Sequence, residues 1–98
     1  RARPYLHLIA GELEQRDLPG ELALLPVLES GYRTDVVSPY GAAGLWQFMG
    51  GTGNKFGLEI DRWYDGRLDA VRSTGAALNY LNALHDRFDG DWLLAVAA

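Results

Sequence analysis

An unbroken apolar stretch that ends in a single carboxylate constrains the fold of this chain more than any other feature. Residues 22–28 are all apolar and lead directly to Glu29 and to a backbone break at Gly31. As a helix, the stretch is apolar nearly all round, which is typical of a buried helix. Glu29 then lies one turn beyond Leu25 and points the same way, at the inner end of that helix. Pro26 predicts a kink within it.

The predicted position of Glu29 has chemical consequences. Burial disfavours the charged form of a carboxylate, and the partial negative charge at the carbonyl end of a helix acts in the same direction. A carboxylic acid that stays protonated near neutral pH is what general acid catalysis requires. The alternative is that Glu29 ends the helix and turns into water. A fully buried Glu is rare unless it is paired or functional, which favours the general acid and leaves the alternative open.

Helical spacing of apolar residues recurs along the rest of the chain. It is clearest over roughly 68–87, where apolar residues step by threes and fours and Asp65 or Asp69 can cap the N-terminus. The predicted helical segments are 3–16, Pro19 to Ser30, 44–49, 54–56, about 68–87 and 92–98. No segment alternates between apolar and polar residues as a half-buried strand would. We therefore predict an all-α fold, a compact helical domain that spans 1–98.

Glycine, proline and aromatic residues separate these helices. The segments 31–43 and 59–66 read as loops, and residues 89–91 as a turn between helices. The glycine-rich tract 50–53 reads as an interruption. It lacks the Gly-Lys-Ser/Thr ending of a phosphate-binding loop and follows no strand, and both observations argue against that interpretation.

Composition excludes several classes of function. The chain has 98 residues, with 9 basic and 13 acidic residues and a net charge of −4, and no basic stripe that would favour nucleic acid or an anionic membrane. It contains no cysteine, and His7 and His85 belong to no metal-ligand pattern. No apolar run approaches the ~20 residues of a membrane span. We expect no metal, no cofactor and no membrane span, whereas a neutral polymer such as a glycan stays compatible.

A general acid at Glu29 would need neighbours that orient it and bind a substrate. Ser30 is adjacent and suits the first role, and Gln47, a polar residue in an apolar segment, suits the second. Aromatic faces with a polar handle suit sugar rings. The aromatic candidates are Tyr32, Tyr40, Trp46 and Trp63.

Each of these residues also has a structural interpretation. Ser30 could bond the carbonyl groups of its own helix, and Gln47 could be an exposed helix residue. Trp46 and Trp63 could belong to the core. Ordinary glycosidases pair two carboxylates, but no spacing singles out a second one here. The chain therefore offers one special carboxylate.

Several short motifs occur in a characteristic order along the chain. They are Glu29-Ser30, Gly41-Ala42-Ala43-Gly44-Leu45-Trp46-Gln47-Phe48-Met49, Tyr64-Asp65, Asn79-Tyr80-Leu81 and Phe88-Asp89-Gly90-Asp91-Trp92. Their order and spacing resemble the catalytic domain of family 1 lytic transglycosylases, and most of all its membrane-bound D-type members. The resemblance covers nearly the whole chain and implies a lysozyme-like helical fold of the goose type.

The resemblance also implies a mechanism. Glu29 matches the single catalytic acid/base, which protonates the glycosidic oxygen between N-acetylmuramic acid and N-acetylglucosamine. It then takes the proton of the muramoyl 6-hydroxyl and closes a 1,6-anhydro ring without water. Participation of the N-acetyl group replaces a second carboxylate. Ser30 matches the residue that helps to bind and orient, and Gln47 matches the motif glutamine that contacts sugar, while Tyr32, Tyr40 and Trp46 are further candidates for substrate binding.

Two departures from the family pattern matter. Gly50-Gly51 stands where the family usually has proline and a small residue. The third family motif, Ala-Tyr-Asn, would follow directly on Ala97-Ala98, so we expect a domain truncated at its C-terminus. The tyrosine of that motif supports the catalytic Glu, and the 98-residue chain alone is therefore expected to be weak or inactive.

Two other functions stay open. One is a muramidase of the same fold, which adds water instead of forming the anhydro ring. The other is a glycan-binding module without turnover. The expected partner is peptidoglycan and the expected location is the bacterial cell envelope, in the periplasm or with an outer-membrane anchor on the full-length protein. We expect a monomer.

Overall fold

The computed structural model describes residues 3–91 and consists of helices joined by irregular loops. The helices are α1 (Arg3–Gln15), the 3-10 helix η1 (Gly20–Leu24), α2 (Leu25–Ser30), α3 (Gly50–Lys55), the 3-10 helix η2 (Gly66–Leu68) and α4 (Ala70–Arg87). Within this range the only β structure is a set of isolated antiparallel bridges. The prediction of an all-α fold is thus confirmed, and the predicted helix 92–98 lies outside the described residues.

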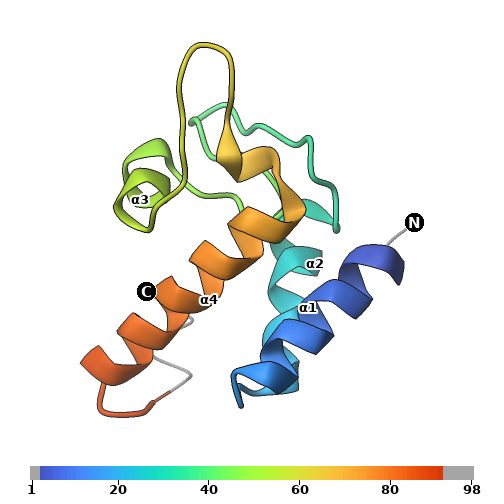
Figure 1. Cartoon of the computed structure of the whole chain (residues 1–98), viewed down its shortest axis with the longest axis vertical. Coiled ribbons are helices and arrows are strands. Elements are labelled where there is room, and N and C mark those ends of the chain that lie inside the picture. The colour runs from blue at the N-terminus through green and yellow to red at the C-terminus, as the bar shows by residue number, and fades with distance from the viewer. Residues whose placement is uncertain (1–2, 92–98) are drawn as a thin grey trace.

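The longest helix, α4, crosses the middle of the molecule, with α1 and α2 on one side and α3 on the other (Figure 1). Its start agrees with the predicted cap, because the Asp69 carboxylate accepts a hydrogen bond from the backbone N–H of Arg72 at 2.9 Å. The core lies where α1 meets α4, and Ile9, Leu13 and Leu78 are almost fully buried there. Burial of these side chains, at about 25 cal/mol per Å² of apolar surface, is the main force that holds the helices together.

The apolar stretch before Glu29 is not one buried helix. It forms η1 and then α2, and Pro26 sits in the first turn of α2, where its missing N–H costs no helical hydrogen bond. The break at this point agrees with the predicted kink. Leu22, Ala23 and Pro26 are buried, but the opposite face of the stretch is exposed. The exposed apolar side chains are Leu24, Val27 and Leu28.

The segment predicted as a short helix, 44–49, is a turn. Ala43 and Phe48 exchange two backbone hydrogen bonds, 3.0 and 3.1 Å long, which close a four-residue turn between them. Gly44 (φ +84°) and Gln47 (φ +51°) both adopt left-handed backbone, which a helix does not allow. We name Gly44–Gln47 the glutamine turn.

The glycine tract was predicted to interrupt the chain, and instead it forms helix α3. Gly53 is buried, and an added Cβ would lie 3.4 Å from the side chains of Ile60 and Arg67. The absence of side chains lets this helix approach its neighbours closely, which offsets the poor helix propensity of glycine.

Candidate active site

Ser30 joins the end of α2 to the glutamine turn. Its hydroxyl lies 2.7 Å from the carbonyl oxygen of Leu45 and 3.2 Å from that of Pro26, and both oxygens are acceptors. Gly31 ends the helix with left-handed backbone (φ +62°). The Glu-Ser motif and the Gly-Leu-x-Gln motif, far apart in the sequence, are therefore in direct contact.

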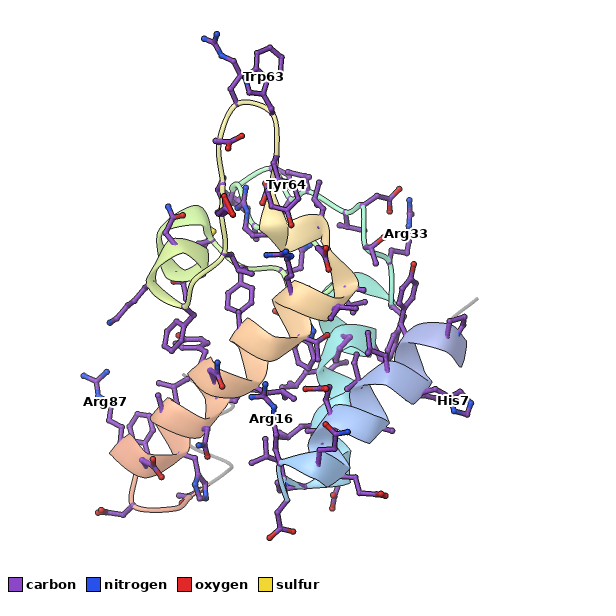
Figure 2. All side chains as sticks on the ribbon, in the orientation of Figure 1. His7, Arg16, Arg33, Trp63, Tyr64 and Arg87 are labelled. Carbon is purple, nitrogen blue, oxygen red and sulfur yellow. The ribbon has the colours of Figure 1, made fainter. Side chains whose placement is uncertain are left out.

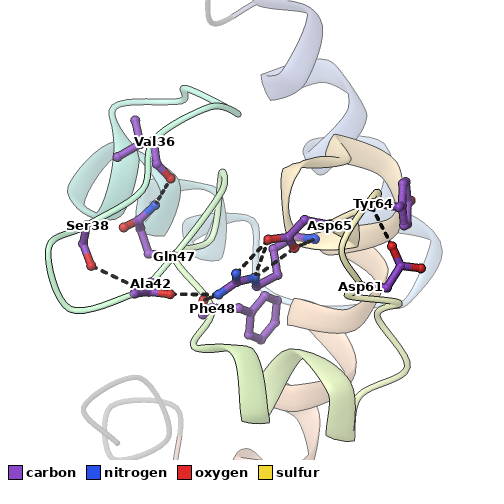
Figure 3. Close-up of polar contacts among 10 residues, drawn as sticks. Val36, Ser38, Ala42, Gln47, Phe48, Asp61, Tyr64 and Asp65 are labelled. Atoms are coloured by element: carbon purple, nitrogen blue, oxygen red, sulfur yellow. Dashed lines mark hydrogen bonds and ion pairs between the residues drawn. The ribbon is translucent and has the colours of Figure 1, made fainter.

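Gln47 is held by two backbone carbonyl groups. Its Nε2 donates to the oxygen of Gly44 at 2.7 Å. It also donates to the oxygen of Val36 at 3.0 Å, the bond drawn in Figure 3. The side chain is half-buried, and its Oε1 has no hydrogen-bond donor among residues 3–91. The amide is thus fixed in orientation and presents an acceptor, which is a suitable arrangement for a sugar hydroxyl or N–H group.

An ion pair between Asp65 and Arg67 is bonded to the chain on either side of the glutamine turn (Figure 3). Arg67 Nη2 lies 2.7 Å from one carboxylate oxygen of Asp65 and Nε lies 2.9 Å from the other, a bidentate geometry. The Nη1 of Arg67 donates to the carbonyl oxygens of Gly41 at 2.8 Å and Phe48 at 3.1 Å. We call this pair and its two carbonyl contacts the Arg67 clamp.

The clamp is mostly buried, and its electrostatics follow from that. The side chains of Arg67 and Asp65 are 13% and 23% exposed. The hydrogen bond from the Arg67 side chain lowers the pKa of Asp65, and the same bond raises the pKa of Arg67. Asp65 also accepts from the backbone N–H of Arg67 at 3.0 Å and so caps η2, whereas the long helix α4, for which Asp65 was the other predicted cap, is capped by Asp69. The clamp itself was missed, because a carboxylate and a guanidinium two residues apart do not by themselves indicate contacts with carbonyl groups some twenty residues away.

Gly44 lies directly against the backbone of Arg67. A Cβ on Gly44 would be 1.8 Å from the carbonyl oxygen of Arg67, which no packing adjustment of a side chain can relieve. Its φ of +84° also favours glycine. This position requires glycine for two independent reasons.

Glu29 is exposed, which corrects the prediction that it is buried. It lies in the last turn of α2, next to Leu28, whose side chain is 79% exposed. Among residues 3–91 no hydrogen bond or ion pair joins Glu29 to another side chain. The carboxylate stands beside an exposed apolar strip, formed by Leu24, Val27 and Leu28, because no described element packs over that face of α2.

Two of the predicted aromatic contacts lie in the core instead. Tyr32 is 6% exposed and its hydroxyl donates to the carbonyl oxygen of Ala23, and burial raises the pKa of Tyr32. Trp46 is 8% exposed, and its Nε1 donates to Thr74 Oγ1 at 3.0 Å. The structural interpretation of Trp46 therefore holds, and neither ring can serve as a wall for a sugar. Each ring has a structural role. Tyr32 stabilises η1 through its bond to Ala23, and Trp46 attaches the glutamine turn to α4 through its bond to Thr74.

The remaining aromatic candidates are on the surface. Tyr40 is 86% exposed in the loop before the glutamine turn, and Trp63 is 87% exposed in the loop before Asp65. The core interpretation of Trp63 is wrong. Both loops are attached to the Arg67 clamp, one through Gly41 and the other through Asp65.

The described part of the chain contains no group of three or more His, Asp or Glu side chains that could hold a metal ion. A surface hollow lies elsewhere, between the end of α1 and the start of η1, and it contains none of the predicted site residues. No helix in residues 3–91 has the length and apolar character needed to cross a membrane.

Comparison with known proteins identifies the family of the chain. The family model described as the transglycosylase SLT domain matches residues 8–98. The whole chain is 50% identical to membrane-bound lytic murein transglycosylase D of Escherichia coli (strain K12), of which it covers 22%. It is also 50% identical to a protein of Alteromonas sp. (strain M-1) named for resistance to tributyltin chloride, of which it covers 47%. The chain thus spans less than half the length of these relatives, and it belongs to the transglycosylase SLT domain family.

Proposed function

We propose that the protein containing this chain is a lytic transglycosylase that cleaves peptidoglycan between N-acetylmuramic acid and N-acetylglucosamine. The observation that carries the proposal is the 2.7 Å hydrogen bond from Ser30 to Leu45. It holds the segment that ends in Glu29 against the turn that presents Gln47. A carboxylic acid and an oriented amide are thereby supported by one rigid contact, as acid catalysis on a bound sugar requires.

In the proposed mechanism Glu29 acts twice. It donates a proton to the glycosidic oxygen as the bond from that oxygen to C1 of N-acetylmuramic acid breaks. The resulting carboxylate accepts the proton of the muramoyl 6-hydroxyl while the 6-oxygen bonds to C1. The products are a free 4-hydroxyl on N-acetylglucosamine and a 1,6-anhydro ring, with no water consumed and Glu29 protonated again. The acetamido group of the muramoyl sugar stabilises C1 between these two steps and takes the place of a second carboxylate.

The surface around Glu29 fits this role once a ligand or further protein covers it. Val27 and Leu28 are exposed and apolar, and they precede the carboxylate in α2. A ligand or further protein that covers these side chains also excludes water around Glu29, which strengthens the interaction of its carboxyl group with a leaving oxygen.

Two further residues are proposed to bind sugar. Gln47 offers Oε1 to a hydroxyl or acetamido N–H, because its Nε2 is already engaged. Tyr40 offers an exposed ring with a polar handle. Ser30 is proposed to orient rather than to react, since its proton is given to a carbonyl oxygen, although its own oxygen can still accept from a substrate hydroxyl.

The test uses the full-length protein and purified peptidoglycan, with mass spectrometry of the soluble products. Wild type should release fragments with 1,6-anhydro ends, and Glu29→Gln, which is isosteric, should lower release by about 10²–10⁴-fold, the loss typical of a missing general acid. Glu21→Gln is the matched control, because Glu21 is an exposed carboxylate in η1 outside the site. Fragments with reducing ends would identify a muramidase, and binding without release would identify a glycan-binding module. Undiminished release by Glu29→Gln would remove this residue from the mechanism.

A location in the bacterial cell envelope follows from the proposed substrate. One relative is named as membrane-bound and as acting on murein, which supports the envelope for this protein too. We further propose a periplasmic position. We also propose that the protein is a monomer, and sedimentation of the full-length protein can check its oligomeric state.

A further inference from the structure

The loop between α3 and η2 is a stiff hairpin with an exposed tryptophan at its tip. Ile60 and Asp65 form an antiparallel bridge, and the backbone N–H of Asp61 donates to the carbonyl oxygen of Tyr64 at 2.7 Å. The Asp61 carboxylate accepts from the backbone N–H groups of Trp63 at 2.7 Å and Tyr64 at 2.8 Å. Side-chain bonds of this kind stabilise a tight turn. We call residues 60–65 the tryptophan hairpin.

Trp63 extends from this hairpin into solvent (Figure 2). Its side chain is 87% exposed, although Trp is among the most buried residues on average. The guanidinium carbon of Arg62 lies 5.9 Å from the ring centroid, so a cation flanks one face and the other face is open. An indole held in water on an ordered turn contributes nothing to the core and leaves one flat ring face open to a ligand.

The hairpin is attached to the candidate site at its base. Asp65, its last residue, is the carboxylate of the Arg67 clamp, and Arg67 in turn bonds the carbonyl oxygens of Gly41 and Phe48. Those two carbonyl groups flank the glutamine turn. The position of Trp63 relative to Gln47 is thus set by short polar contacts and not by a free loop, which lowers the entropy lost when one ligand contacts both.

We propose that Trp63 is a sugar-binding platform for the glycan strand of peptidoglycan, beyond the sugars that Gln47 and Glu29 contact. This inference rests on the proposed function. The open indole face matches the C–H face of a pyranose ring. Arg62 places a positive charge beside this ring at the tip of the tryptophan hairpin, although the whole chain has a net charge of −4. That local positive charge suits the carboxylates of a peptidoglycan strand.

The experiment measures binding of the full-length protein to purified, protein-free peptidoglycan sacculi, in the Glu29→Gln background so that the polymer is not consumed. Trp63→Ala should raise the dissociation constant up to about tenfold, in line with the loss of one aromatic contact. Trp63→Phe should restore much of the affinity, because it keeps a flat ring. The matched control is Leu6→Ala, an exposed apolar residue on α1, which should bind like the parent. Melting temperatures should be unchanged for Trp63→Ala, since the side chain packs on no core residue.

Two outcomes would overturn the inference. One is unchanged binding to sacculi by Trp63→Ala. The other is Trp63-dependent binding to phosphatidylglycerol vesicles without any Trp63-dependent binding to sacculi, which would make the hairpin a membrane contact. The binding assay and the product assay test the two proposals separately. If wild type does not cleave peptidoglycan but Trp63→Ala still weakens binding to sacculi, the proposed function is wrong and the role of Trp63 as a sugar-binding platform is supported.

Discussion

The hydroxyl of Ser30 donates to the carbonyl oxygen of Leu45 over 2.7 Å, and this contact brings together two motifs that the chain separates by a long loop. The same loop leads to the glutamine turn, and Arg67 bonds the carbonyl oxygens of Gly41 and Phe48, which lie on either side of that turn. The candidate site is therefore supported from both sides, by a helix end and by a buried ion pair. The relative positions of Glu29 and Gln47 depend on a few polar contacts to backbone carbonyl groups, because the site is built on turns and a short helix instead of long helices.

Replacing Ser30 with Ala should weaken this junction. The carbonyl oxygen of Leu45 would lose its donor, which should lower the free energy of unfolding by about 1 kcal/mol, the typical net value of such a bond. The rate of product release should also fall, and by more than the small loss of folded protein explains, since Glu29 adjoins the lost contact. Urea unfolding and product assays on the same preparation check both, and Ser38→Ala in the next loop is the control for a hydroxyl that bonds only local N–H groups. Equal turnover by Ser30→Ala and wild type would contradict the positioning role.

Replacing Gly44 with Ala should be severely destabilising. The new Cβ would lie 1.8 Å from the carbonyl oxygen of Arg67, and the φ of +84° adds strain of its own. We expect a loss of at least about 3 kcal/mol or failure to fold. Gly57→Ala is the matched control, because Gly57 has φ +90° and nothing within 4 Å of its Cβ position. That variant should lose only about 1–2 kcal/mol from backbone strain, and equal losses at both positions would show that the close approach is unimportant.

The buried ion pair should make stability depend on pH. The hydrogen bond from Arg67 holds the pKa of Asp65 below its ordinary value of 3.8. A lowered pKa means that the folded state binds the proton less readily than the unfolded state, so the pair stabilises the fold above about pH 4 and is lost as the pH falls through the lowered pKa. Asp65→Asn should therefore be less stable than wild type at neutral pH, and the difference should shrink in acid. Thermal melts between pH 7 and pH 2 test this, with Asp35→Asn as the control for a largely exposed ion pair.

Replacing Arg67 with Lys should loosen the glutamine turn. A lysine keeps the charge, but its three N–H donors on one nitrogen cannot reproduce the bidentate pairing with Asp65 together with both carbonyl contacts. We expect a loss of about 1–3 kcal/mol in stability and a higher KM for peptidoglycan fragments, with kcat changed less, because Gln47 is proposed to bind and not to react.

Coupling to Gln47 distinguishes this effect from general destabilisation. If Arg67 acts through the turn, then Arg67→Lys should raise KM much less in a Gln47→Ala background than in wild type. Arg72→Lys, at an exposed ion pair on α4, should leave KM unchanged in either background. If the two substitutions act independently, their fold-changes in KM multiply in the double variant, and that result would contradict the coupling.

Much of the helical framework could be predicted from the sequence. α1 and α4 agree with their predicted ranges to within about two residues, and the cap at Asp69 was predicted too. These features depend on the spacing of apolar residues and on side chains that bond the nearest N–H groups, which are local properties of a chain. The motif order that resembles the lytic transglycosylases was also legible without coordinates, and the match to the family over residues 8–98 confirms it.

What the sequence alone determined was therefore where the two longest helices, α1 and α4, lie and which family the chain belongs to, whereas tertiary structure decided what each side chain faces. An apolar run does not reveal which of its faces finds a partner, and so Glu29 was predicted to be buried and is exposed. Tyr32 and Trp46 were candidates for substrate binding and lie in the core, because other elements supply Ala23 and Thr74 as their hydrogen-bond partners. Burial and pairing depend on contacts between residues far apart in the chain, and no local pattern encodes them.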